Sequence, residues 1–345
     1  MICLCYFLVL VLSGIVASVQ QPVIDITSLF QQNNEERLKT GREILIALEN
    51  FGYFLAIGSI ITEDRQGNQI VAAKKLFSEV STSEKENYKM SVNDVGNFAR
   101  GFIQFGSESG LSTIFEPKEG FSYGNPENIK PSNPLESINI WPENINQTLK
   151  ITIESVFKDH TIIVNEIVNV LGEVLSIDFH DIFDYSGNIS LMRMFHYLAV
   201  PDNDNTNTLG SSAHTDWGFL TSILGDSSGL QVRHKDEWLD VPAIKGSMII
   251  NAGDFLALIT NNLIQAPIHR VLSPVTTDRY SYVLFHYPNY NFRLATLKRS
   301  PNDVAEVDND GSNKLLFNTL KDQNFDANEF FGDIIVMKWQ QVYRI

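Results

Sequence analysis

Five residues between positions 214 and 281 have the types and spacing that iron chemistry requires. His214 and Asp216 form a His-x-Asp pair, and His269 follows that aspartate after 53 residues. Two imidazoles and one carboxylate are the ligand set of a non-haem Fe(II) site that keeps open positions for O2. Arg279 and Ser281 form an Arg-x-Ser, whose guanidinium and hydroxyl suit a carboxylate. The pattern predicts a metal, a reaction type and a co-substrate class together.

Strand geometry explains how these side chains can meet. Residues i and i+2 of a strand point to the same face of the sheet. His214 and Asp216 can therefore chelate one metal from a single strand or strand end, and Arg279 and Ser281 would face one interior. His269 opens a separate β-branched segment, which would supply the third ligand.

The second half of the chain is patterned as short strands separated by turns. This pattern is typical of a β-sandwich or barrel rather than of alternating strands and helices. A helix beginning near residue 329 would close this β core. The predicted strands are residues 191–197, 219–224, 230–233, 248–252, 255–258, 269–272 and 280–287.

The first half of the chain is mainly helical in its patterning. It predicts strands at 22–26 and 52–57, helices at 35–50, 63–77 and 145–177, and a loop-rich stretch at 93–142. The expected regions are 19–150 (helices and loops), 151–300 (a long helix and the β core) and 301–345 (a helical tail). The fold class is mixed α and β.

Residues 2–17 are almost wholly apolar and precede Ser18, Val19, Gln20 and Gln21, so that residues 1–18 are predicted to form a signal peptide. The run is short for a transmembrane helix and has the length of a signal-peptide hydrophobic region. Sequons at Asn146 and Asn188 are compatible with secretion. We expect the protein in the secretory pathway or secreted, with no stable membrane association once the leader is removed. The alternative is a cytoplasmic protein whose N-terminal segment is buried.

Composition excludes several function classes. The chain has 345 residues and a net charge of −15, which argues against nucleic acid because phosphate binding needs clustered lysine and arginine. The two cysteines, Cys3 and Cys5, both lie in the leader. A mature chain without cysteine has no disulfide, zinc finger or cysteine nucleophile.

The chain resembles the isopenicillin N synthase-like branch of the Fe(II)/2-oxoglutarate-dependent dioxygenases. The resemblance covers nearly the whole chain after the leader, and its motifs occur in the family's order. They are PVID at 22–25, FGYF at 51–54, RGF at 100–102, KEGF at 118–121, WP at 141–142, HTDWG at 214–218, NAGD at 251–254, HRV at 269–271 and RYS at 279–281.

The resemblance implies a double-stranded β-helix, or jelly-roll, core between a helical N-terminal region and a C-terminal helix. It implies that His214, Asp216 and His269 bind Fe(II) and act in catalysis with O2. It also implies that Arg279 and Ser281 hold the distal carboxylate of 2-oxoglutarate, with a hydroxyl from Tyr197. The family often has asparagine two residues before that tyrosine, where this chain has Phe195, and the proline-rich turn that follows is replaced at 198–201. These departures concern the proximal carboxylate and leave the iron ligands unchanged.

Such an enzyme would couple oxidative decarboxylation of 2-oxoglutarate to oxidation, by default hydroxylation, of a small organic molecule, releasing succinate and CO2. One alternative is an oxidase of the same fold, such as an isopenicillin N synthase-like enzyme, in which Arg279 and Ser281 bind a substrate carboxylate. Another is a non-enzymatic jelly-roll binding module. Phe102, Phe105 and Phe121 either line an apolar pocket with Phe285 or belong to the core. The sequence indicates neither the substrate nor the oligomeric state.

Overall fold

The computed structural model describes residues 20–93, 97–109, 114–179, 182–183, 189–201, 208–293 and 329–343. The predicted leader at 1–18 and the sequon residue Asn188 lie outside these residues. No helix in the described ranges is long and apolar enough to cross a bilayer.

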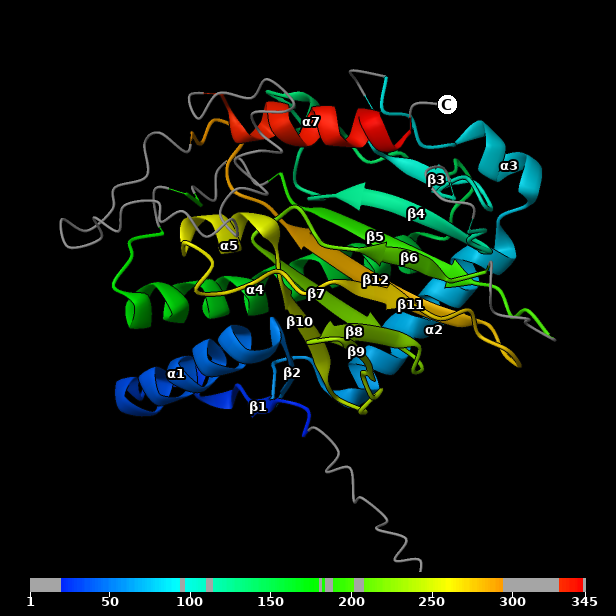
Figure 1. Cartoon of the computed structure of the whole chain (residues 1–345). Coiled ribbons are helices and arrows are strands. Elements are labelled where there is room, and N and C mark those ends of the chain that lie inside the picture. The colour runs from blue at the N-terminus through cyan, green and yellow to red at the C-terminus, as the bar shows by residue number, and fades with distance from the viewer. Residues whose placement is uncertain are drawn as a thin grey trace, which may run out of the picture.

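Two sheets form the centre of the molecule (Figure 1). The larger contains β1 (Val23–Asp25), β2 (Tyr53–Ile57), β3 (Gly101–Ile103), β4 (Lys118–Gly124), β5 (Leu191–Tyr197), β7 (Leu220–Gly225), β10 (Met248–Ala252) and β12 (Arg279–His286). The smaller contains β6 (Ser211–His214), β8 (Leu230–His234), β9 (Glu237–Asp240) and β11 (His269–Val271). The spatial orders are β1-β2-β10-β7-β12-β5-β4-β3 and β6-β11-β8-β9.

The two sheets share an apolar interior, which confirms the predicted jelly roll. Pairing among the core strands is antiparallel, and only β1 and β2 of these strands run parallel. One buried cluster joins Phe195, Ile223 and Val283 of the larger sheet to Val232 and Val271 of the smaller one. Side chains that alternate along a strand therefore point either into this interior or toward the helices.

Helices surround the sheets, and two of them, residues 63–79 and 147–175, pack against the outer face of the larger sheet. The helices are α1 (Asn34–Phe51), α2 (Glu63–Glu79), α3 (Thr82–Asn87), α4 (Gln147–Leu175), α5 (Asp254–Ile259) and α7 (Phe331–Val342). Figure 1 shows α4 behind the sheet with α1 and α2 beside it, and α7 along another edge of the molecule. The helical N-terminal region and the closing C-terminal helix are thus confirmed. The boundary expected at residue 150 falls inside α4, so both regions contribute to one core.

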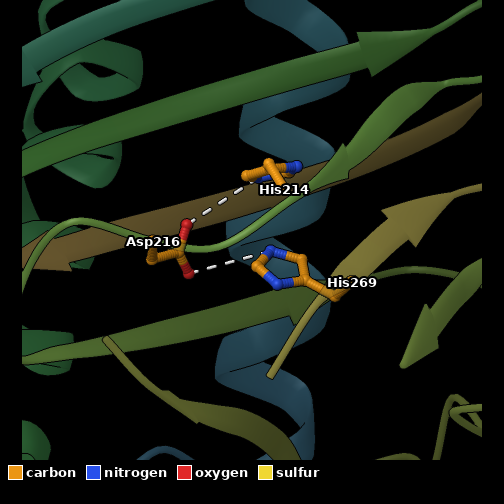
Figure 2. Close-up of side chains that lie close together, drawn as sticks. All are labelled: His214, Asp216 and His269. Carbon is orange, nitrogen blue, oxygen red and sulfur yellow. Dashed lines mark ion pairs between the residues drawn. The ribbon is translucent and has the colours of Figure 1, made fainter. Parts of the chain in front are cut away.

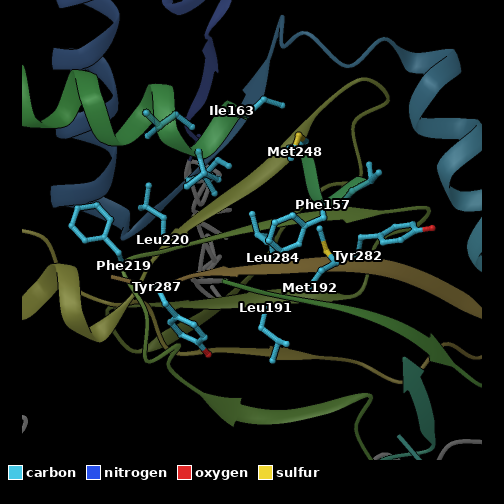
Figure 3. Packing of buried hydrophobic residues seen from close by; sticks show 14 of the residues in the cluster. Phe157, Ile163, Leu191, Met192, Phe219, Leu220, Met248, Tyr282, Leu284 and Tyr287 are labelled. Atoms are coloured by element: carbon cyan, nitrogen blue, oxygen red, sulfur yellow. The ribbon is translucent and has the colours of Figure 1, made fainter. Parts of the chain in front are cut away.

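The α4 helix is the scaffold on which the sheet packs. The side chain of Asn146 caps it by accepting a hydrogen bond from the Leu149 N–H. Phe157 and Ile163 point from α4 toward Leu220 and Leu284 of the sheet (Figure 3). Burying such a side chain contributes roughly 1.5–3 kcal/mol each. This contact fixes the outer face of the strands whose inner face forms the site.

Two segments differ from the predictions. Residues 255–258 were expected as a strand, but they belong to α5. A short apolar run fits either element, and here the N–H groups of Asp254 and Phe255 bond to the carbonyls of Asp216 and Gly218. The stretch 93–142 was expected to be loop-rich, yet it contains β3 and β4, and β4 pairs along its whole length with β5. Glycine and serine in β4 hide the alternation that identifies strands.

Candidate functional site

The hydrogen-bonding ladder of the smaller sheet positions the two histidines. His214 is the last residue of β6, and His269 is the first residue of β11. The two are register partners across this antiparallel pair, and their ring centroids lie 4.3 Å apart. Asp216 follows β6 by two residues and faces both rings from one side, with one carboxylate oxygen toward each (Figure 2). The structure therefore brings the three side chains named from the sequence together, the two histidines by strand pairing and Asp216 from the loop that follows β6.

The three side chains present their ligand atoms to a common point. The Nε2 atoms of His214 and His269 lie 3.8 and 3.7 Å from the two carboxylate oxygens of Asp216. Each Nδ1 atom faces a backbone carbonyl, that of Ser212 at 2.7 Å or Pro267 at 3.1 Å. If each Nδ1 carries its proton, both Nε2 lone pairs are free for a metal.

A divalent metal fits this arrangement. One ligand atom from each of the three residues lies within 4.8 Å of the others. Two ligands bonded to one ion at about 2.0–2.2 Å lie no more than about 4.4 Å apart, a span that includes the 3.8 and 3.7 Å distances from the two histidines to Asp216. The Asp216 Oδ2 atom is buried without a hydrogen-bond partner among the described residues, as expected of an acceptor meant for a cation. Partial desolvation in the cavity and the neighbouring His269 lower the pKa of His214 below its usual range, although its ring is 43% exposed, and this favours the neutral imidazole that a metal requires.

Backbone contacts from the start of α5 hold Asp216 in place. The Asp254 N–H donates to the Asp216 carbonyl at 2.7 Å, and the Thr215 hydroxyl donates to the Asp254 carboxylate at 3.2 Å. A Cβ atom on Gly253 would lie 2.1 Å from the Gly218 carbonyl oxygen. The NAGD and HTDWG segments therefore fit closely only because residue 253 has no side chain.

Arg279 and Ser281 face the same interior, as predicted. Both are buried on β12, and Arg279 is the register partner of Tyr197, whose ring lies 4.9 Å from the guanidinium carbon. The Arg279 Nε donates to the Ser227 carbonyl at 3.1 Å. Its Nη1 atom and the Ser281 hydroxyl have no partner among the described residues. Two buried polar groups left open side by side fit an anionic ligand.

The turn at 225–229 reads Gly-x-Ser-x-Gly, the pattern of a hydrolase nucleophile elbow. That elbow requires a strand, a sharp turn and a helix. Here the segment joins β7 to β8, and the Ser227 backbone carbonyl accepts a hydrogen bond from Arg279. The motif therefore supports the arginine and does not form a nucleophile site.

One cavity of about 460 Å³ contains all of these groups. His214, Asp216 and His269 line it together with Arg279, Ser281 and Tyr197. Phe285 also lines it, as one reading of the sequence allowed. Phe102 and Phe121 lie in the helix-side core and Phe105 is 51% exposed, so those three phenylalanines do not form the pocket.

Four charged side chains in the pocket were not predicted. Glu108, Glu116, Lys118 and Arg193 all line the cavity and are buried. Arg193 alternates with Phe195 and Tyr197 along β5, so its orientation toward the interior follows from strand period alone. That alternation was the available signal, whereas the two glutamates come from a segment expected to be a loop.

Comparison with known proteins places the chain in a family. Residues 188–288 match the profile of the 2OG-Fe(II) oxygenase superfamily, and residues 21–144 match that of the non-haem dioxygenase in morphine synthesis N-terminal region. A probable iron/ascorbate oxidoreductase of Dictyostelium discoideum is 32% identical over 305 residues, which cover 79% of this chain and 82% of the relative. The chain belongs to the 2-oxoglutarate/Fe(II) oxygenase family.

Other relatives agree with this membership. The 2-oxoglutarate-dependent dioxygenase citB of Monascus ruber is 29% identical over 306 residues, covering 83% of this oxygenase and 90% of the relative. A full-length Neurospora crassa protein, crystallised in complex with alpha-KG and thymine, shares the fold, with a TM-score of 0.71 at 23% identity over 83% of this chain and 90% of that one. As a family member, this 2-oxoglutarate/Fe(II) oxygenase is a non-haem iron oxidoreductase whose cofactors are Fe(II), 2-oxoglutarate and O2.

Proposed function

We propose that this oxygenase hydroxylates a small organic molecule and converts 2-oxoglutarate to succinate and CO2. The observation that supports the proposal is that one cavity contains both a set of metal ligands and a pair of donors suited to a carboxylate. The cluster of His214, Asp216 and His269 shares the pocket with donors of Arg279 and Ser281 that have no partner in the part of the chain that the structure describes. A metal and a carboxylate can therefore be held together.

Each residue has a distinct role in this proposal. His214, Asp216 and His269 hold Fe(II), which supplies the activation of O2 when bound. Arg279 and Ser281 bind the distal carboxylate of 2-oxoglutarate, and Tyr197 adds its hydroxyl beside them. The guanidinium fork suits a planar carboxylate better than an ammonium group does. Apolar side chains, among them Ile223, Val271 and Val283, line the cavity around these groups, and a less polar surrounding strengthens their contacts with a charged ligand.

The rival activity is an oxidase of the same fold that does not consume 2-oxoglutarate. In that case Arg279 and Ser281 would bind a carboxylate of the substrate itself. Their geometry fits a carboxylate of the substrate as well as that of 2-oxoglutarate. A non-enzymatic binding module is the second rival. The complete set of three metal ligands favours an enzyme over that module.

Anaerobic titration distinguishes these possibilities. Wild-type protein with Fe(II) is titrated with 2-oxoglutarate, and the metal-to-ligand charge-transfer band of the chelate is recorded. The band should appear in wild type and weaken about 10- to 100-fold in apparent affinity in Arg279→Ala, since a hydrogen bond to a charged group contributes about 1.5–3 kcal/mol. Arg270→Ala is the matched control, because Arg270 contacts Gln231 and Trp238 outside the cavity.

The outcomes separate the three activities. A band together with O2-dependent succinate formation supports the dioxygenase. Product formation at full rate without 2-oxoglutarate identifies the oxidase. Iron binding with no O2 consumption across a broad substrate screen identifies the binding module.

We also propose that the protein enters the secretory pathway. The support is the apolar run at 1–18, whose length matches a signal-peptide hydrophobic region. Expression of the full chain and of a chain beginning at residue 19, each with a C-terminal fluorescent tag, tests this. Secretory localisation that depends on residues 1–18 is expected, whereas cytoplasmic localisation of both would contradict it.

A further inference from the structure

A second buried arginine faces the same pocket as Arg279. Arg193 lies on β5, where it is the register partner of Val283, while Arg279 is the partner of Tyr197. The two arginines are thus four residues apart along neighbouring strands, which corresponds to about 14 Å at about 3.4 Å per residue. Both are almost fully buried. The cavity therefore has one buried arginine toward each end. The proposed function assigns a ligand to Arg279 and none to Arg193.

Arg193 is held in one orientation with a donor to spare. Its guanidinium lies 4.7 Å from the Trp339 ring and 5.3 Å from the Phe195 ring. Its Nη2 atom bonds to Glu108 at 2.6 Å and to the Tyr343 hydroxyl at 2.5 Å. Its Nε atom is buried without a partner among the described residues. A buried donor without an acceptor indicates a place for a ligand.

The charges around Arg193 already balance. Lys118 lies 2.5 Å from Glu116 and 3.4 Å from Glu108, so two cations face two carboxylates. Burial raises the pKa of Glu108, but the attraction of Arg193 and Lys118 and its hydrogen bonds outweigh burial and lower that pKa to about 2. Glu108 is therefore ionised. A further carboxylate buried here would be an uncompensated charge, whereas a neutral acceptor would not.

Aromatic side chains form the walls next to this arginine. Trp217, Phe285 and Tyr287 line the cavity with Trp339, and the Trp217 and Trp339 rings pack edge to face at 5.1 Å. Flat rings stack well on such walls, while one polar group fixes their orientation. The combination of a neutral ion cluster, a free donor and aromatic walls defines a chemical class of substrate.

We propose that Arg193 determines which substrates this oxygenase binds. Its Nε donates to the carbonyl or hydroxyl oxygen of a neutral, flat-ringed molecule that packs against Trp339 and its aromatic neighbours. The inference rests on the proposed function, because it assigns the Arg279 end of the pocket to 2-oxoglutarate. It names the class of substrate that the remaining space accepts.

Binding of matched ring compounds tests this proposal. The probes are pairs that differ in one charge, such as benzamide with benzoate and thymine with uracil-5-carboxylate, within a panel of several dozen neutral ring compounds. Anaerobic protein loaded with Fe(II) and 2-oxoglutarate is screened by ligand-observed NMR. The charge-transfer band is recorded in each sample, so that loss of the metal and co-substrate site is seen separately from loss of ring binding.

Two variants remove the proposed contact without leaving an unpaired buried charge. Arg193→Lys keeps the cation beside Glu108 but lacks the Nε donor, and the double variant R193M/E108Q removes one charge of each sign. The matched control is the double variant R65M/D159N, which neutralises the ion pair between α2 and α4 outside the cavity. Each variant must retain the band to be scored, and two variants guard against one that fails to fold.

The expected result is binding of neutral rings in preference to their carboxylates, weakened about tenfold or more in both Arg193 variants and unchanged in the control. The proposal is overturned if carboxylates bind at least as tightly as their neutral partners. It is also overturned if Arg193→Lys keeps full affinity, or if no neutral ring compound binds to protein that shows the band. Absence of the band in wild type would instead contradict the 2-oxoglutarate assignment.

Discussion

His269 lies directly opposite His214 across the β6–β11 pair, with ring centroids 4.3 Å apart. Residues opposite each other on one face of an antiparallel pair have Cβ atoms about 4.5–5.5 Å apart, whatever their separation in sequence. The two imidazoles are therefore positioned by backbone hydrogen bonds, and only Asp216 depends on a loop. The position of Asp216 therefore depends on the contacts that α5 makes with this loop.

The Asp216→Asn substitution should abolish tight iron binding while leaving the fold intact. An amide keeps the shape of the carboxylate but loses its charge, and even changes to the outer partners of metal ligands cost about 10–100-fold in affinity. We therefore expect anaerobic Fe(II) titration to show a loss of more than about 100-fold. The metal-free variant should be at least as stable as wild type, since the buried Oδ2 atom accepts no hydrogen bond from any residue that the structure describes. His234→Gln is the control, because His234 stacks on Phe51 outside the site.

A single methyl group at Gly253 should weaken metal binding from outside the ligand set. In Gly253→Ala the new Cβ would lie 2.1 Å from the Gly218 carbonyl oxygen and 3.2 Å from that of Asp216. The loop carrying Asp216 must move, so we expect a loss of about tenfold or more in Fe(II) affinity and about 1–3 kcal/mol in the free energy of unfolding.

Gly67→Ala provides the opposite case for the same chemical change. Gly67 lies in α2, where a Cβ atom would meet no atom within 4 Å. The free energy of unfolding should rise by about 0.5–1 kcal/mol, because alanine is the better helix former. Urea unfolding and iron titration of both variants check the pair, and equal effects on iron affinity would contradict our account of the loop.

Neighbouring isoleucines on α4 should differ sharply in their contribution to stability. Ile163 is fully buried against the sheet, whereas Ile162 is 47% exposed. We expect Ile163→Ala to lower the free energy of unfolding by about 2–5 kcal/mol and Ile162→Ala by less than about 0.5 kcal/mol. Chemical denaturation measures both. Similar losses for the two would show that the helix does not present Ile163 to the core.

His196 should make stability depend on pH above its ordinary titration range. Burial lowers the pKa of this histidine, but its hydrogen bonds to Glu119 at 2.9 Å and Asp278 at 2.8 Å outweigh burial and raise it above 6.5. A raised pKa in the folded state means that the protonated form stabilises the fold at low pH. This stabilisation is lost as pH rises through the folded-state pKa.

The test measures unfolding free energies at about pH 6, below the unfolded-state pKa, and then at successively higher pH. Wild type should lose more stability over this range of pH than His196→Gln, which cannot titrate. Asp278→Asn should show an intermediate slope, since Glu119 remains as a partner. Identical slopes for wild type and His196→Gln would contradict the role given to this histidine.

The predictable part of the site is the part governed by local spacing. The i and i+2 relation places Arg279 and Ser281 on one face from sequence alone, and the family motifs supply the iron ligands. The ion cluster is different, because Glu108 meets Arg193 and Tyr343 only through tertiary packing, across as many as 235 residues. Such contacts leave no local pattern in the sequence.

The errors in secondary structure have a similar origin. The apolar run of α5 is compatible with helix or strand until its N–H groups find the carbonyls of the Asp216 loop. The strand character of β4 comes from its neighbour β5, not from its own glycine and serine residues. The sequence did not decide whether Phe102 and Phe121 line the pocket or belong to the core. In the structure they lie on β3 and β4 and pack in the core.

The α7 helix has a consequence for the order of events during biosynthesis. Its Trp339 and Val342 complete a cavity whose other walls are encoded from residue 108 onward. A nascent chain that has not yet released α7 from the ribosome already contains β6, β11 and all three metal ligands, but it lacks the wall that Trp339 and Val342 form. Iron acquired at that moment would activate O2 without a substrate beside it. We therefore expect productive iron loading to follow the folding of α7, and a chain stopped before Phe331 to damage its own pocket oxidatively when given Fe(II), 2-oxoglutarate and air.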